Sequence, residues 1–195
     1  MIITKDEFIN NKRKFLKQMT KEIFIYPTDT IYGLGCDATN TQLVNKLREI
    51  KGSSIQPFSI IAPNKKWVYD NCEVGEKEKE FVEKLGTYIE IKGKQHRFTI
   101  ILKLKKDSAL SKAVNPGKNT IGIRIPNNWF SKIVEELGKP IITTSANKTG
   151  SDFMTNTEDL NSTIKNKVAF IIYEGEKKGR PSTIINLVDQ PQILR

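Results

Sequence analysis

The chain has 195 residues, 37% of them hydrophobic, and its 32 lysines and arginines against 22 aspartates and glutamates give a net charge of +10. This length and composition suit one globular core, so we expect residues 1–195 to form a single domain. Two cysteines and one histidine exclude a disulfide framework and a Cys/His zinc site, and we expect no metal-ligand set. Because the sequence has no apolar run of membrane-spanning length and no signal peptide, we expect a cytoplasmic protein without membrane contacts.

Hydrophobic periodicity predicts alternating helices and strands, which is typical of an α/β or α+β fold. We expect helices at residues 5–19, 41–50, 76–85, 129–137 and, as a short element, 157–164. We expect strands at residues 23–26, 58–62, 98–104, 121–125, 141–144, 168–173, 183–188 and 192–194. After the first strand, Pro27, Gly33 and Gly35 predict that the chain leaves the sheet and turns sharply.

Three segments at strand boundaries carry hydroxyl and amide side chains. They are residues 27–35 (PTDTIYGLG), 140–147 (PIITTSAN) and 179–186 (GRPSTIIN). Ligands of α/β proteins bind beyond the carboxyl ends of strands, so these segments predict a pocket.

Charged residues near these segments indicate what the pocket binds. Arg124 interrupts an apolar strand and therefore needs a partner, and Lys51 ends a helical pattern. Together with the hydroxyls they can orient anions and zwitterions by position and electrostatics. The lone His96 is expected on the surface or in a loop, and not as a general base. The positive net charge also favours polyanionic partners such as nucleotides or RNA.

Taken together, these segments resemble the YrdC/TsaC family of threonylcarbamoyl-AMP synthases over essentially the whole chain. The resemblance implies a YrdC-like twisted mixed sheet with flanking helices around a concave basic groove. It also implies an L-threonylcarbamoyladenylate synthase, which converts L-threonine, bicarbonate and ATP into threonylcarbamoyl-AMP and pyrophosphate. A downstream threonylcarbamoyl transferase complex would then modify an adenosine of tRNA. From this chemistry Mg²⁺ is expected on the ATP phosphates.

The resemblance also assigns roles to individual residues. Four positions match contacts to threonine: Thr30, Arg124, Thr143 and Ser182. Five match contacts to ATP: Lys51, Thr120, Ser145, Asn147 and Arg195. Arg124 matches the arginine that pairs with the threonine carboxylate and Lys51 matches the lysine that faces the phosphates, so these two are the expected catalytic groups.

Two stretches depart from the family pattern. The family usually has Lys-x-Arg-Pro where this chain has KGSS at 51–54, so Ser53 replaces a phosphate-facing arginine. Arg48, about one helical turn earlier, is the alternative phosphate contact. Residues 93–97 (GKQHR) replace a Pro-Gly-Pro turn. The sequence Pro57-Phe58-Ser59 is also similar to that of the YciO-type subgroup of the family.

Two other functions remain open. One is a non-catalytic module of the same fold that binds tRNA or other double-stranded RNA, which the net charge of +10 favours. The other is a carbamoyl-adenylate enzyme with a different acceptor amine, as in the related domain of hydrogenase maturation proteins. That domain normally belongs to a longer chain with zinc-binding cysteines, which this sequence lacks.

Overall fold

The computed structural model describes residues 1–52, 55–188 and 191–194. Its helices are α1 (Lys5–Asn10), α2 (Lys12–Met19), α3 (Thr41–Lys51), α4 (Lys65–Asn71), α5 (Glu76–Glu83), α6 (Trp129–Leu137) and α7 (Ser162–Lys165). Its strands are β1 (Ile2–Ile3), β2 (Phe24–Pro27), β3 (Tyr32–Gly35), β4 (Ser59–Ile61), β5 (Ile89–Ile91), β6 (Lys94–His96), β7 (Phe98–Lys103), β8 (Thr120–Arg124), β9 (Ile141–Ser145), β10 (Ile171–Ile172), β11 (Thr183–Asn186) and β12 (Gln192–Ile193).

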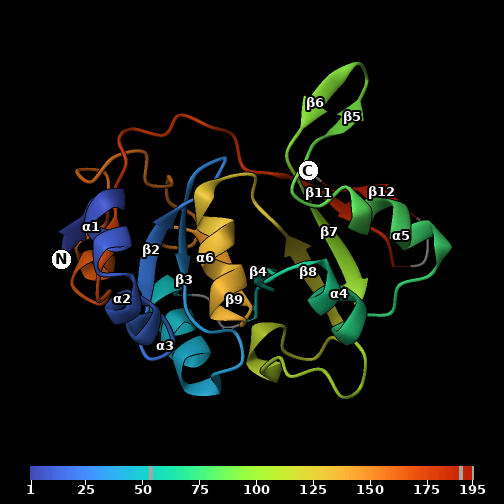
Figure 1. Cartoon of the computed structure of the whole chain (residues 1–195), viewed down its shortest axis with the longest axis horizontal. Helices are drawn as coiled ribbons and strands as arrows, with labels where there is room; N and C mark the ends of the chain where they lie inside the picture. The colour runs from blue at the N-terminus through green and yellow to red at the C-terminus, as the bar shows by residue number, and fades with distance from the viewer. Residues whose placement is uncertain (53–54, 189–190, 195) are drawn as a thin grey trace.

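Within these residues, ten strands form one twisted sheet in the order β1-β10-β2-β3-β9-β4-β8-β7-β11-β12 (Figure 1). β10 is parallel to β1 and β2, and β4 is parallel to β8. β3 lies antiparallel between β2 and β9, and β7 is antiparallel to β8. The mixed sheet with its packed helices confirms the predicted fold class. β5 and β6 form a separate hairpin that projects from the rest of the molecule in Figure 1.

The sheet has a core on each face, because successive side chains of a strand point in opposite directions. Phe24 and Tyr26 of β2 join a cluster with residues of α1, α2 and α6, in which the rings of Tyr26 and Phe130 stack 4.5 Å apart. Ile25 between them belongs to a second cluster that includes residues of α3, α4 and α5. Burial on both faces explains why the strand at 23–26 has a continuous apolar sequence.

The helix predicted at 5–19 is in fact two helices. Asn11 separates α1 from α2 with φ −117° and ψ 26°. The break allows the rings of Phe8 and Phe15 to stack with their centroids 5.2 Å apart. Residues seven apart in a continuous helix are separated by about 10.5 Å along its axis, so the aromatic contact requires the break.

Several short elements differ from the prediction. The sequence analysis missed β1, α4, β5 and β6, and the helix expected at 157–164 begins at Ser162. His96 lies half-buried in β6, where its Nδ1 is 3.2 Å from the Thr183 hydroxyl. None of the helices in the described part of the chain combines the length and apolarity needed to cross a membrane.

Residues 27–35 contain the end of β2, the turn of the first hairpin and β3. The chain turns sharply after Pro27, as predicted, but Gly33 and Gly35, which the sequence placed in the departing segment, lie in β3. β3 returns antiparallel to β2, and neither Gly33 nor Gly35 has a positive φ. A Cβ at Gly33 would lie 2.8 Å from the ring of Tyr26, and a Cβ at Gly35 would collide with the carbonyl oxygen of Ile142. These glycines are therefore required for close packing inside the sheet.

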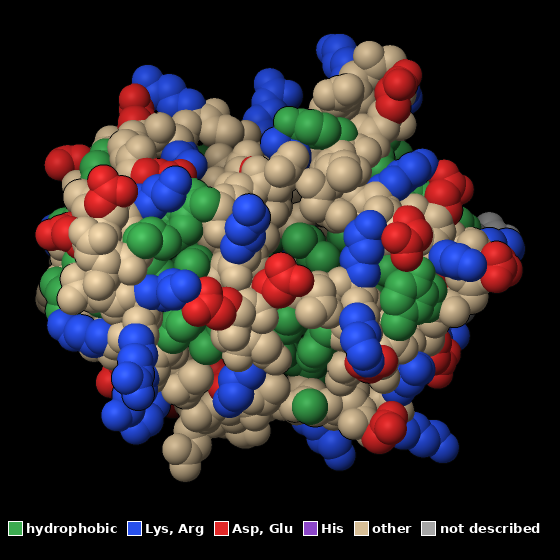
Figure 2. Space-filling view, viewed as in Figure 1, with side chains coloured by type: hydrophobic (Ala, Val, Ile, Leu, Met, Phe, Trp, Pro, Cys, Tyr) green, Lys and Arg blue, Asp and Glu red, His purple; other side chains and the backbone are tan. Residues whose placement is uncertain are grey.

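The chain carries a net charge of +10. Figure 2 shows lysine and arginine side chains scattered across one face and interspersed with aspartate and glutamate. Among the described side chains on this face, the basic residues do not gather into one large patch.

Candidate functional site

A cavity of about 330 Å³ lies where the β2–β3 hairpin, β4, β8 and β9 meet the segment before β11. Its volume falls within the range of small-molecule sites, roughly 300–1,000 Å³. Arg124 lines it together with eight serine and threonine side chains: Thr28, Thr30, Ser59, Thr99, Thr143, Thr144, Ser145 and Ser182. All three segments singled out in the sequence contribute to this lining. The predicted pocket is therefore present.

Strand register arranges the centre of the cavity. Ser59 of β4 lies between Gly122 of β8 and Thr143 of β9. A Cβ at Gly122 would collide with the Ser59 hydroxyl, so the glycine makes room for that group. Two residues further along β8, Arg124 projects from the same face of the sheet, because strand side chains alternate. Arg124 and the central hydroxyls consequently share one cavity.

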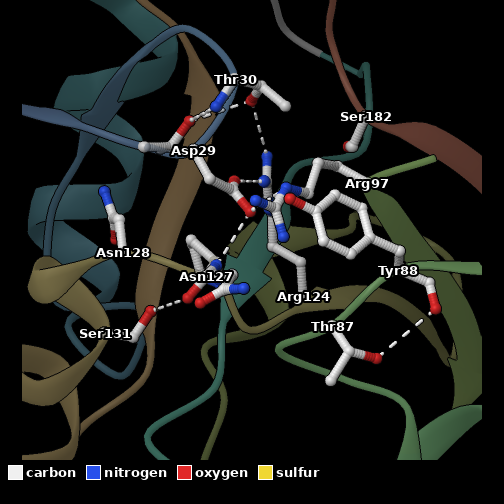
Figure 3. A network of polar contacts seen from close by, with 12 residues as sticks. Asp29, Thr30, Thr87, Tyr88, Arg97, Arg124, Asn127, Asn128, Ser131 and Ser182 are labelled. Carbon is white, nitrogen blue, oxygen red and sulfur yellow. Dashed lines mark hydrogen bonds and ion pairs between the residues drawn. The ribbon is translucent and has the colours of Figure 1, made fainter. Parts of the chain in front are cut away.

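Arg124 contacts the β2–β3 hairpin at the cavity. Its Nη1 donates to the Thr30 hydroxyl at 3.2 Å, and its Nη2 forms an ion pair with the Asp29 carboxylate (Figure 3). The Thr30 hydroxyl lies 2.9 Å from that of Thr28. The partner expected for a charge inside an apolar strand is thus Asp29. These contacts hold the planar guanidinium in place, a geometry suited to binding a carboxylate.

Asp29 and Arg97 are site residues that the sequence analysis missed. Asp29 Oδ2 accepts the backbone N–H of Asn127 at 2.8 Å and lies 3.2 Å from Arg97 Nε. The guanidinium carbon of Arg97 is 3.7 Å from the centre of the Tyr88 ring. In the sequence, Asp29 was visible as the one carboxylate of the hydroxyl-rich segment. Its pairing with residues far away in the chain was not.

Lys51 lies next to Ser145, which lines the cavity from β9. Its Nζ donates to the Ser145 carbonyl oxygen at 2.8 Å and to Asn147 Oδ1 at 2.9 Å. Gly52, with φ 65°, caps α3 directly after it. Burial lowers the pKa of Lys51 to about 8. An ammonium group has three donors, and the third has no partner within the described residues, so it is available to an anion.

Arg124 and Ser145 enter the cavity from different backbone positions. Ile61 of β4 pairs with both Arg124 and Ile141, and Ser145 lies four residues beyond Ile141 on β9, about 13 Å along the strand. The guanidinium of Arg124 extends to Thr30, three residues before Gly33, the strand partner of Ser145. The site therefore combines a guanidinium suited to a carboxylate with an ammonium beside Ser145 suited to a phosphate.

The structure brings together most of the candidate residues. Thr30, Arg124, Thr143, Ser145 and Ser182 line the cavity, and Lys51 and Asn147 lie beside Ser145. Thr120 is not among the described lining residues, and its carbonyl oxygen accepts a hydrogen bond of 2.6 Å from Asn115 Nδ2. Ser53 and Arg195 lie outside the described residues. The described residues contain no group of three or more His, Cys, Asp and Glu side chains that could hold a metal ion.

Arg48, the alternative phosphate contact, is instead engaged with the protein backbone. Its guanidinium donates to the carbonyl oxygens of Ala113, Gln56 and Val114 at 2.7, 2.9 and 2.9 Å. It also stacks over the ring of Phe58, 4.4 Å from the ring centre. These contacts assign Arg48 to holding two loops together.

Residues 174–182, here called the strap, run from β10 towards β11 past the tip of the hairpin (Figure 1). The Tyr32 hydroxyl donates to the Gly175 carbonyl oxygen at 2.6 Å. A Cβ at Gly179 would collide with the Thr30 carbonyl oxygen. At the end of the strap, the Ser182 hydroxyl lies 2.8 Å from that of Thr99 inside the cavity. The strap thus joins the hairpin to the cavity wall.

The chain is similar in sequence to a known protein family and to several of its members. Residues 18–195 match the Sua5/YciO/YrdC family, described as "Telomere recombination". The chain belongs to this family. A putative threonylcarbamoyl-AMP synthase of Methanocaldococcus jannaschii is 33% identical over 186 residues, which cover 91% of this chain and 83% of that protein. The threonylcarbamoyl-AMP synthase of Bacillus subtilis is 31% identical over 179 residues, 89% of this chain and 49% of that protein. Uncharacterised YciO of Escherichia coli is 25% identical over 177 residues, 88% of this chain and 81% of that protein.

A solved relative confirms the expected fold. Sua5 of Pyrococcus abyssi complexed with L-threonine matches 100% of this chain and 57% of its own chain, with a TM-score of 0.83 and 23% identity. This chain therefore spans only about half the length of the Bacillus and Pyrococcus proteins. The similar family members include both threonylcarbamoyl-AMP synthases and YciO, so membership alone leaves the activity to be tested.

Proposed function

We propose that this chain is an L-threonylcarbamoyladenylate synthase, which forms threonylcarbamoyl-AMP and pyrophosphate from L-threonine, bicarbonate and ATP. The observation that carries the proposal is a single cavity that is lined by Arg124, Thr30 and Ser145 and has Lys51 hydrogen-bonded to Ser145. This arrangement suits an amino acid and a nucleotide bound next to each other. Two relatives with the synthase name support it.

The amino acid binds at Arg124. Its carboxylate pairs with the guanidinium of Arg124, and its ammonium and hydroxyl groups contact the hydroxyls of Thr143, Thr30 and Ser182. A cavity lined mainly by hydroxyls can satisfy a small zwitterion that has one further hydroxyl. The relative Sua5 of P. abyssi has been solved with L-threonine, which supports threonine as the amino acid.

The nucleophile comes from the substrate. The threonine ammonium loses a proton to solvent, the free amine attacks the carbon of bicarbonate, and loss of water leaves a carbamate. A carbamate oxygen then attacks the α-phosphorus of ATP, a new O–P bond forms, and the bond to the β-phosphate breaks as pyrophosphate leaves with its electron pair. The protein contributes position and electrostatic stabilisation, since this step needs no protein nucleophile.

The nucleotide binds beside Ser145. Lys51 is protonated at neutral pH, because its pKa of about 8 is above that pH, and its third donor pairs with a phosphate oxygen. Ser145 and Asn147 contact the nucleotide alongside it. Mg²⁺ would arrive with the ATP, coordinated chiefly by phosphate oxygens and water, which is its usual arrangement in nucleotide sites. It would neutralise charge on the leaving pyrophosphate.

Pyrophosphate release by the purified chain tests this function. With ATP, L-threonine, bicarbonate and Mg²⁺ present, we expect steady release that falls to background when either threonine or bicarbonate is omitted. Arg124→Lys should lose most of the threonine-dependent rate, because an ammonium cannot reproduce the bidentate fork. Absence of release from a folded chain that binds tRNA would contradict the synthase and favour the RNA-binding alternative.

A further inference from the structure

A second arginine shares the carboxylate that holds Arg124. Asp29 Oδ1 pairs with Arg124 Nη2, and Asp29 Oδ2 lies 3.2 Å from Arg97 Nε (Figure 3). The side chains of Asp29, Arg124 and Arg97 are 5%, 7% and 20% exposed. Solvent therefore screens these ion pairs much less than it screens pairs at the protein surface.

The three residues do not balance in charge. Two guanidinium groups face one carboxylate, which leaves one excess positive charge in a largely buried place. Two cations that share one anion in a poorly solvated place favour the approach of a further anion. Of the three residues, only Arg124 is among the described cavity-lining residues. The excess charge is thus presented to a ligand through Arg124.

The position of Arg97 is fixed by its surroundings. It directly precedes β7, at the base of the projecting β5–β6 hairpin, and its guanidinium stacks on Tyr88. Its Nη1 is buried and has no hydrogen-bond partner in the described part of the chain. An arginine held by a ring on one side and a carboxylate on the other keeps its charge next to Asp29.

We propose that Arg97 is a positioning residue for the binding of the substrate carboxylate. By pairing with Asp29, Arg97 offsets the negative charge that would otherwise neutralise Arg124, and so leaves the charge of Arg124 to the incoming carboxylate. The identity of that carboxylate as L-threonine's rests on the proposed function. The segment that supplies Arg97, residues 93–97, is also one of the two departures from the family pattern.

Calorimetric titration with two matched ligands tests this role. L-Threonine carries the carboxylate, and L-threoninol has a hydroxymethyl group in its place. In Arg97→Met we expect L-threonine to bind roughly tenfold more weakly, because a nearby charge is lost in a poorly solvated place, while L-threoninol binding changes little. Arg97→Lys should recover part of the loss. Lys94→Met removes an exposed positive charge from β6 of the same hairpin, so it serves as the matched control and should retain the L-threonine affinity.

The outcomes separate this inference from the proposed function. If the wild-type chain binds L-threonine but Arg97→Met weakens both ligands equally, Arg97 only anchors the hairpin and the inference is overturned. Unchanged L-threonine binding in a folded Arg97→Met variant overturns it as well. If the wild-type chain does not bind L-threonine at all, the proposed function fails, and the inference fails with it. Melting curves of each variant confirm that the folded chain is being compared.

Discussion

Lys51 is a buried cation whose protonation depends on its surroundings. Burial lowers its pKa from 10.5 to about 8, so folding disfavours the protonated form. The stability that follows from this shift is fully present above pH 10.5 and is lost as the pH falls through about 8. At neutral pH the chain therefore keeps a charged lysine at some cost in stability. A bound phosphate would offset this cost.

ATP binding should for this reason be coupled to proton uptake. Near pH 8 about half of the Lys51 side chains are protonated in the free chain, and a bound phosphate should raise the pKa and draw in a proton. Titration calorimetry in two buffers with different ionisation enthalpies measures the uptake. Lys51→Arg, which stays charged, should abolish the uptake while it retains part of the affinity. An equal uptake in wild type and variant would contradict the role of Lys51.

Lys51 and Arg48 lie on the same helix but should respond differently to truncation. Lys51→Ala should weaken ATP binding by about 1.5–3 kcal/mol, the range for a charge-assisted contact. Arg48→Ala should lower the free energy of unfolding by about 2–4 kcal/mol, because three backbone carbonyl groups lose their donor. Nucleotide titration and denaturant unfolding of both variants check this. Loss of ATP binding in a stable Arg48→Ala variant would show that Arg48 contacts the phosphates.

At the scale of single residues, the sequence identified charged groups whose sequence neighbours are apolar. Arg124 was identifiable because a charge in an apolar strand requires a partner. That partner, Asp29, and its second arginine, Arg97, could not be found, since their pairing depends on how the hairpin and the start of β7 meet in space. Local spacing also suggested Arg48 as a phosphate contact, whereas the tertiary structure gives its donors to backbone carbonyl groups.

Among the elements, the β2–β3 hairpin shows two reasons why a position can require glycine: conformational freedom and close packing. The sequence favoured conformational freedom, but Gly33 and Gly35 have ordinary strand geometry and are needed because a ring and a carbonyl group lie close to them. Long periodic segments such as α3 and α6 were predicted well, since one apolar face specifies them. The short β5–β6 hairpin has no such face and was missed.

The packing role of Gly35 can be measured. Gly35→Ala should lower the free energy of unfolding by about 1–3 kcal/mol through overpacking against the Ile142 carbonyl group. Gly150 is the comparison site, because it has φ +85° and a Cβ added there would meet no neighbouring atom within 4 Å. Gly150→Ala should cost only the backbone strain, about 1 kcal/mol. Equal losses in urea unfolding of the two variants would contradict the packing explanation.

For the whole molecule, the mixed sheet assembles one cavity from segments that are distant in the sequence. The hairpin, the ends of β8 and β9 and the strap each contribute polar side chains. On the face shown in Figure 2 the basic side chains are dispersed among acidic ones, so this face does not form the single basic surface that the net charge suggested. The fold class followed from alternating patterns, and the position of the cavity followed from strand boundaries. The charges beside it required the three-dimensional arrangement.

Incorporation of labelled bicarbonate tests the proposed synthase most directly. The purified chain is incubated with ATP, Mg²⁺, L-threonine and ¹³C-bicarbonate, and the adenylate products are analysed by mass spectrometry. We predict threonylcarbamoyl-AMP that carries one labelled carbon, strongly reduced in Arg124→Lys and absent without threonine. A folded chain that binds both ATP and L-threonine but forms no labelled adduct would contradict the proposed function.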